Sequence, residues 1–132
     1  MKTNSNIGLL ILRLTTGGLM LFHGVAKLGH IDAVMHMLSN HGLPEFMAYG
    51  VYITELLAPL LIIIGFRTRL AALVFTFGMF FALFLAHSEN LFALSKTGGL
   101  AIEMILLYAF GALALFFTGP GNYAVSKSNT WD

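Results

Sequence analysis

The chain has 132 residues, of which 58% are hydrophobic and 10% charged, and its mean hydropathy is +0.83. A soluble domain carries about 25% charged residues, so the composition excludes a water-exposed surface and predicts one integral membrane domain over residues 1–132 in the lipid bilayer. A net charge of +1 without a basic stripe excludes nucleic acid as a partner, and the absence of cysteine excludes disulfides and thiol chemistry.

The first apolar run, residues 7–28, is long enough to span a bilayer but contains Arg13, His23 and Lys27. A charge at this depth costs at least about 2.5–3.5 kcal/mol and must face a partner, a cavity or a ligand. Arg13 also interrupts any signal peptide, so we expect a retained helix, with Asn6 as its N-cap. At 100° per residue, one helical face combines the cations with small residues that allow close helix packing. That face consists of Arg13, Gly17, Met20, Gly24 and Lys27.

Residues 30–46 break the apolar pattern, and their helical spacing predicts a short amphipathic helix at the membrane surface. The second span, residues 46–65, contains Glu55 near its middle and Pro59 one turn later, where a kink is expected. A short basic turn then leads into the third span, residues 69–87, so these two spans should form an antiparallel hairpin.

The fourth span, residues 99–118, carries Glu103 near its start and ends at a Gly-Pro-Gly stop. The sequence therefore predicts an all-α, four-helix transmembrane bundle with both termini on one side. Basic residues gather on that side, so the positive-inside rule predicts a multi-pass protein with cytoplasmic termini. These residues are Lys2, Arg67, Arg69 and Lys127.

Helix depth, at about 1.5 Å per residue, suggests how the buried charges pair. Arg13 lies roughly 9 Å and Glu55 roughly 15 Å from the same membrane face, which predicts an inner Arg13–Glu55 pair. At the other end, four residues from three spans reach a similar depth and predict an outer polar cluster. This cluster consists of His23, Lys27, His87 and Glu103. The formal charges of both groups sum to zero, as a low-dielectric interior requires, although Glu55 could instead bridge the two.

These polar residues admit a structural interpretation and a functional one. They either hold the helices together or line a pocket for a small polar or quinone-like ligand. His23 and His87 are also candidate axial ligands of a haem, but two histidines alone identify no haem site. His30, His36 and His41 lack further ligands, so no metal site is predicted. The third span is rich in phenylalanines that face lipid, pack the bundle or wall an apolar cavity, namely Phe75, Phe77, Phe80, Phe81 and Phe84.

A series of short motifs extends over nearly the whole chain. In order they are Arg13 in the first span, His23-Gly24-x-x-Lys27-Leu28, Gly42-Leu43-Pro44, Glu55, Gly65-Phe66-Arg67-Thr68-Arg69-Leu70-Ala71-Ala72, His87, Gly98-Gly99-x-x-x-Glu103 and Gly119-Pro120-Gly121. In this order and spacing the motifs resemble the DoxX-like family of small four-span bacterial inner-membrane proteins. The resemblance implies a membrane component of an oxidoreductase or oxidative-stress system, with redox partner proteins, and it supplies no catalytic residues.

We therefore expect a quinone-linked membrane subunit whose polar cluster binds the ligand. Lys27 or His23 would donate hydrogen bonds to a quinone, and Glu103 or His87 would relay protons. Two alternatives remain. One is a small-molecule carrier, which with four helices would require a homo-oligomer; the other is a scaffold that recruits soluble redox enzymes through Arg67, Arg69 and the C-terminal tail.

Overall fold

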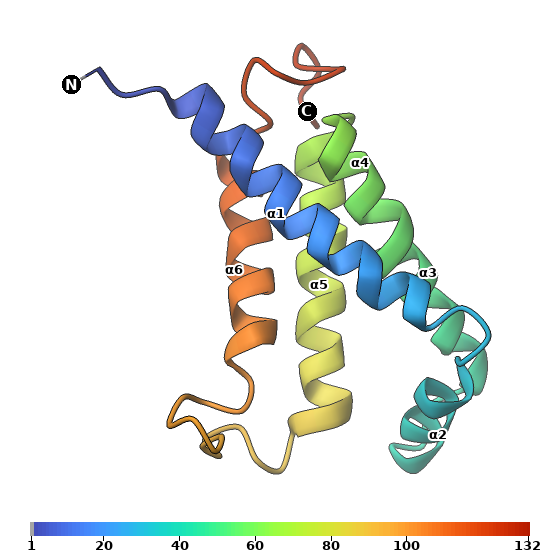
Figure 1. The fold of residues 1–132 in the computed structure, drawn as a ribbon. Helices are drawn as coiled ribbons and strands as arrows, with labels where there is room; N and C mark the ends of the chain where they lie inside the picture. Colours follow the sequence, from blue (N-terminus) through green and yellow to red (C-terminus); the bar gives the residue numbers. More distant parts are fainter. Residues whose placement is uncertain (1) are drawn as a thin grey trace.

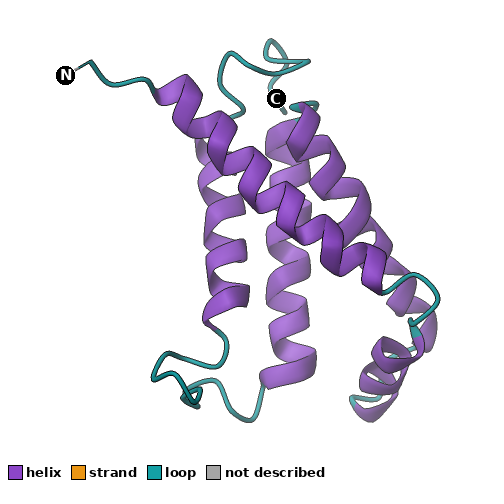
Figure 2. Ribbon diagram, viewed as in Figure 1, coloured by secondary structure: helices purple, strands orange, loops and turns teal. Residues whose placement is uncertain are grey.

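A computed structural model describes residues 2–132, and over this range the fold is all-α, as predicted (Figures 1 and 2). A single isolated β-bridge joins Leu94 to Leu100 in a loop. In chain order the elements are α1 (Ser5–Ala26), α2 (Asp32–Asn40), the 3-10 helix η1 (Glu45–Tyr49), α3 (Gly50–Tyr52), the π-helical turn η2 (Ile53–Leu57), α4 (Ala58–Ile64), α5 (Thr68–His87) and α6 (Glu103–Thr118).

Three helical segments are long and apolar enough to cross a membrane: α1, the continuous segment Glu45–Ile64, and α5. The fourth, α6, has 16 residues and a length of about 24 Å, less than the roughly 30 Å of a hydrocarbon core. The expected start at residue 99 is wrong, because the chain turns at Gly98 with φ 95° and the loop closes through a Ser95–Gly99 backbone hydrogen bond. This shortens the fourth span by one turn.

The first helix begins earlier than expected and has a different cap. The side chain of Asn4 accepts a hydrogen bond from the Ile7 amide at 3.2 Å, whereas Asn6 accepts one from the Asn122 amide in the C-terminal tail. The prediction of Asn6 as N-cap is therefore wrong. Asn6 instead joins the start of α1 to the tail, which places both at the same end of the bundle (Figure 1).

Helix α5 packs against both α4 and α6, and α1 lies across the bundle at an angle (Figure 1). Alanines at the α5–α6 contact keep these helices close, because small side chains let backbones approach. The main core is formed by Met20, Ala58, Ile62, Ala71, Ala72, Phe75, Met79, Ala109, Ala112 and Leu115. On α1, Arg13, Gly17, Met20 and Gly24 are all buried, which confirms the predicted interior face up to Gly24.

The amphipathic helix predicted after the first span is present as α2. Its Val34 and Leu38 are buried against Ala48 of η1 and Leu85 of α5, in a second apolar cluster separate from the main core. Its polar residues face outward, as Asp32 and His36 are exposed. Helix α2 therefore covers the end of the bundle opposite the two termini.

Large apolar side chains cover the outside of the bundle. Phe22 of α1, Leu107 of α6 and Phe117 of α6 are each at least 70% exposed. Water-soluble monomers rarely expose continuous apolar surfaces of this kind, whereas lipid accommodates them. The burial pattern therefore agrees with the membrane location that the composition predicts.

The second span departs from a regular α-helix around Pro59. Proline has no amide hydrogen to donate to the carbonyl four residues earlier, which here belongs to Glu55. The chain adopts a π-helical turn at this point, in which the Ala58 amide donates to the Ile53 carbonyl. The expected irregularity thus takes the form of a π-turn that contains Glu55, and such turns often occur at functional sites.

The C-terminal tail folds back over the helix ends that lie beside the N-terminus (Figure 1). The Val125 and Ser126 amides donate to the carbonyls of Ile64 and Gly65, and the Arg67 guanidinium contacts the Asp132 carboxylate at 3.2 Å. Arg69 donates to backbone carbonyls of Phe116 and Thr130. The arginines expected to recruit partner enzymes are thus engaged with the chain's own backbone and tail.

Candidate functional site

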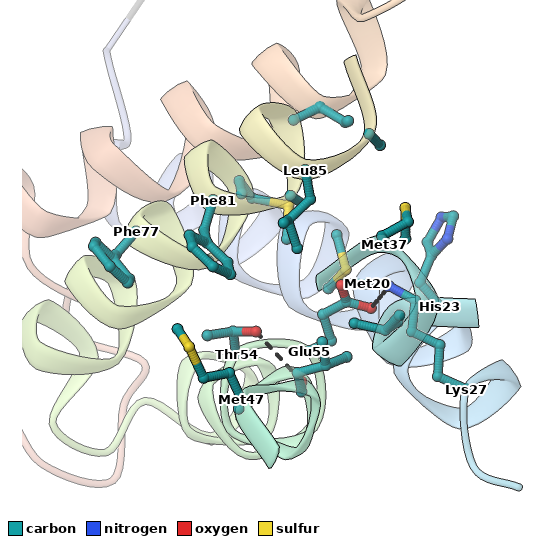
Figure 3. A pocket seen from close by; sticks show the side chains of 18 of the residues that line it. Met20, His23, Lys27, Met37, Met47, Thr54, Glu55, Phe77, Phe81 and Leu85 are labelled. Carbon is teal, nitrogen blue, oxygen red and sulfur yellow. Dashed lines mark hydrogen bonds and ion pairs between the residues drawn. The ribbon is translucent and has the colours of Figure 1, made fainter. Parts of the chain in front are cut away.

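A cavity of about 650 Å³ lies between α1, α2, the η1–η2 segment, α5 and α6 (Figure 3). Its walls are mostly apolar, with a few convergent polar groups, as is typical of small-molecule sites. The polar side chains are those of His23, Lys27, Thr54, Glu55 and Tyr108. It lies toward the end of the bundle opposite the termini, because α2 lines it through Val34, Met37 and Leu38.

An ion pair between Lys27 and Glu55 forms the charged part of this wall. The Lys27 Nζ atom donates to both carboxylate oxygens of Glu55, at 2.6 and 2.7 Å (Figure 3). The Glu55 side chain is 5% exposed and that of Lys27 33% exposed. Burial of an unpaired carboxylate is costly, so the ion pair with Lys27 offsets the burial of Glu55, while Lys27 itself remains accessible from the cavity.

Local backbone structure brings these two residues together. A Cβ atom at Gly24 would collide with the Glu55 carbonyl oxygen, so α1 and the π-turn are in direct backbone contact there. Lys27 follows Gly24 by three residues and therefore points to the same side of α1. The carbonyl that Gly24 approaches is the one that Pro59 leaves without its usual helical donor.

Arg13 occupies a different environment, and its predicted pairing with Glu55 is wrong. Its side chain donates to carbonyl oxygens at the end of α4 and in the tail loop, and it is only 1% exposed. The acceptors are Ile62 (2.8 Å), Ile63 (2.7 Å), Pro120 (3.2 Å) and Tyr123 (2.5 Å). The last carbonyls of a helix lack helical donors and carry partial negative charge, so Arg13 caps α4 from a neighbouring helix.

The register between the helices explains the error. Gly17 lies against Pro59 and Ile63, and Gly24 lies against Glu55, so residue numbers across this antiparallel contact sum to about 79. Arg13 therefore lies opposite the end of α4, more than two turns from Glu55. Depth estimated from rise alone treats the helices as parallel to a common axis, whereas α1 is visibly tilted (Figure 1).

The predicted outer cluster is only partly assembled. Lys27 and His23 line the cavity, but His87 and Glu103 do not. The Glu103 carboxylate lies over Gly99 in its own loop, at the start of α6. His87 ends α5, and its Nδ1 atom is buried without a hydrogen-bond partner among the described residues. The structure thus replaces the predicted four-residue cluster with the Lys27–Glu55 pair and His23, and His87 does not share a cavity with His23.

Tyr108 of α6 is a cavity residue that sequence analysis missed. Its ring meets the His23 ring edge to face, with centroids 5.9 Å apart and an interplanar angle of 82°. Tyr108 lies five residues after Glu103, within an apolar helix where a tyrosine has no distinctive pattern. Its position only becomes informative once the tilt of α1 brings His23 next to α6.

Methionine and phenylalanine side chains form much of the apolar wall. Five of the seven methionines in the chain line the cavity: Met20, Met37, Met47, Met79 and Met104. Methionine side chains are flexible and polarizable and adapt to the shape of a bound molecule. Phe77 and Phe81 of α5 also line it, so two of the five phenylalanines noted in the sequence wall the cavity (Figure 3).

Comparison with known proteins identifies a family match for most of the chain. The sequence model of the family described as DoxX matches residues 8–88, a range that includes most of α1 and all of α2, the Glu45–Ile64 segment and α5. This match contains Lys27 and Glu55 and stops before α6, which contributes Tyr108. No solved structure matches the chain.

Two relatives extend this finding. A Bacillus subtilis protein named "Putative oxidoreductase CatD" is 33% identical over 75 residues, which cover 57% of this chain and 56% of that protein. The alignment thus spans little more than half of the length of that relative. An uncharacterised Haemophilus influenzae protein is 31% identical over 125 residues, covering 90% of this chain and 88% of that relative.

Proposed function

Because the chain belongs to the DoxX family, we propose that it is the membrane-embedded subunit of an oxidoreductase or oxidative-stress system and binds a quinone-like molecule in the cavity beside Lys27. The observation that carries this proposal is the Lys27–Glu55 pair, a charged donor and acceptor in the wall of an otherwise apolar cavity of about 650 Å³. The name of the Bacillus subtilis relative supports the redox part.

The chemistry of the wall suits a ring that carries carbonyl oxygens. The Lys27 ammonium has three donor hydrogens and uses at most two on Glu55, so one remains for a ligand carbonyl. A fixed positive charge stabilises the negative charge that develops on a carbonyl oxygen during reduction. The flexible methionines and Phe81 would pack against the ring faces.

Proton transfer in this proposal is assigned to residues of the cavity. Glu55 and Lys27 already share a short hydrogen bond, and His23 lies at the edge of the cavity with its ring exposed. Histidine exchanges protons near neutral pH, so His23 is the proposed link to the surface. This replaces the expected relay through Glu103 or His87, which lie outside the cavity wall.

The proposed topology keeps both termini in the cytoplasm of a bacterial inner membrane. The two termini and the α4–α5 turn share one end of the bundle, where Lys2, Arg67, Arg69 and Lys127 gather. An excess of basic residues favours the cytoplasmic side. The cavity would then lie in the outer half of the membrane.

The test is equilibrium binding of a benzoquinone with a ten-carbon tail to the purified protein in lipid nanodiscs. We expect saturable binding at one site, weakened at least tenfold by Lys27→Met. Lys96→Met, which removes an exposed lysine from the 88–102 loop, is the matched control and should bind normally. Absence of saturable binding, or equal affinity of the Lys27→Met protein, would contradict the proposal.

A further inference from the structure

The helices around the cavity do not close it equally on all sides. Toward the outer membrane surface, α2 covers it, with Leu38 fully buried against Ala48 and Leu85. Between α5 and the π-turn, a Cβ atom at Gly78 would collide with the Thr54 side chain, so the Thr54 side chain packs directly on the α5 backbone. Contact at these two points can be broken only if a segment moves. Beyond them, Phe46 and Phe77 line the cavity and are 71% and 69% exposed, so the η1–α5 side is the rival route that the experiments below must distinguish.

The side between α1 and α6 is closed differently. Near the inner end the helices touch, because a Cβ atom at Gly111 would lie 3.2 Å from the Thr16 hydroxyl. From there they diverge, since α1 leaves α6 and continues toward α3 (Figure 1). At the level of the cavity, the His23 and Tyr108 rings meet edge to face across this gap.

The two rings at this gap can move without any movement of the helix backbones. The His23 side chain is exposed and Tyr108 is half-buried, and a rotamer change of either ring requires no helix displacement. Met104, one turn from Tyr108 on the same helix, lines the cavity and is also 60% exposed on the lipid-facing surface. The cavity wall is therefore continuous with the membrane-facing surface at this gap.

We infer that the ligand enters the cavity sideways from the bilayer, between His23 and Tyr108, and that it carries an apolar chain that remains in this gap. This inference rests on the proposed function and specifies its ligand class, a membrane-dissolved molecule with a polar ring and a long tail. The polar ring reaches Lys27, four residues after His23 and directly past the end of α1. The tail leaves along Met104 to the apolar surface that includes Phe22 and Leu107.

The experiment uses the absence of cysteine from the natural chain. In the double variant His23→Cys/Tyr108→Cys, a short bis-maleimide would join α1 to α6 across the gap. The protein is loaded with the tailed benzoquinone in nanodiscs, and the exchange of bound for labelled quinone is timed before and after cross-linking. We expect exchange to slow at least tenfold, with bound quinone retained.

The matched control joins the same helices where they already touch, in Thr16→Cys/Gly111→Cys. Cross-linking there should leave the exchange rate unchanged. Unchanged exchange in the cross-linked His23→Cys/Tyr108→Cys protein would overturn the lateral route while leaving quinone binding intact. Slowed exchange in both proteins would also overturn it, because general rigidity would then explain the effect.

A second measurement uses the unmodified protein, so it does not depend on the folding of a cysteine variant. A benzoquinone with a photoreactive diazirine at the end of its tail is cross-linked by light, and the labelled peptides are identified by mass spectrometry. Labels on the outer half of α1 and the start of α6, near Phe22, Met104 and Leu107, are expected. Labels confined to α2, or to Phe46 and Phe77 on the η1–α5 side of the cavity, would overturn the route. No saturable labelling would count against quinone binding itself.

Discussion

Arg13 in α1 and Lys27 directly after it lie on the same helical face but in opposite environments. Arg13 is enclosed by four backbone carbonyls and has no carboxylate partner among the residues the structure describes. Lys27 has one carboxylate partner, and its side chain remains 33% exposed in a cavity. The positive charge of Arg13 is therefore enclosed by backbone groups near the termini, whereas the positive charge of Lys27 stays accessible from the cavity at the opposite end.

The difference follows from what each cation faces. The planar guanidinium has five fixed donors and suits a set of converging carbonyls, and the end of α4 together with the tail loop supplies them. The lysine ammonium is a compact point charge on a flexible stem, which leaves it free to serve both Glu55 and a ligand. A charged residue in a span thus identifies a function only when its partners leave it accessible.

The largest expected effect is from Arg13→Met. Removal of the guanidinium leaves four carbonyls without this donor, and the α4 end and tail loop lose their common anchor. We expect a loss of about 3–5 kcal/mol in unfolding free energy. Thermal unfolding in mild detergent, monitored by circular dichroism, measures this loss of stability. The unfolding free energy of Arg13→Lys should lie between those of Arg13→Met and the natural protein. An Arg13→Met protein as stable as the natural one would show that the hydrogen bonds from Arg13 to the four carbonyls do not matter for folding.

Gly24→Ala should be the next most harmful change, because its methyl group would collide with the Glu55 carbonyl oxygen. The displacement of α1 from the π-turn should lower the unfolding free energy by about 1–3 kcal/mol. It should also weaken quinone binding at least tenfold, because it moves Lys27 away from Glu55. Gly18→Ala is the control, because nothing lies within 4 Å of its added methyl. The same melting and binding measurements apply, and equal behaviour of the two variants would contradict the close contact.

The glycines of α1 show which features of the site could be predicted from the sequence alone. Periodicity placed Gly17 and Gly24 on the interior face of α1, and the structure confirms it. The pairing of charges failed because it depends on the tilt of α1 and on the register with the second span, and neither has a local signal in the sequence. Pro59 predicted an irregular helix, but only the structure shows a π-turn there that positions Glu55.

Removal of one or both members of the Lys27–Glu55 pair distinguishes the contribution of the pair to stability from its contribution to quinone binding. Lys27→Met leaves the buried Glu55 carboxylate unpaired and should destabilise the protein by about 1–3 kcal/mol. The double variant Lys27→Met/Glu55→Met removes both charges and should lie within about 1 kcal/mol of the natural protein, since apolar replacements of buried pairs are often neutral. Quinone binding should be weakened at least tenfold in both variants. A double variant that is less stable than Lys27→Met would mean that the pair itself stabilises the bundle.

The smallest expected effect concerns the tail, where Asp132 joins Arg67 to the C-terminal loop. Burial acts to raise the pKa of Asp132, but hydrogen bonds from Ser126 and Asn129 and the charge of Arg67 outweigh it and hold the pKa below its usual 3.8. A carboxyl with a lowered folded-state pKa stabilises the protein fully above pH 3.8 and loses this contribution as the pH falls through the folded-state pKa. The tail should therefore loosen only below pH 3.8.

Trp131, the only tryptophan in the chain, adjoins Asp132 and reports this step by fluorescence. Its emission should change on acidification below pH 3.8 in the natural protein, whereas Asp132→Asn should show the altered emission already at neutral pH. Asp32→Asn, at the opposite end of the bundle, should titrate like the natural protein. Quinone binding should persist through the change in emission, because the tail contacts Arg13 and not Lys27. Loss of binding together with the change in emission would mean that the two ends of α1 are coupled.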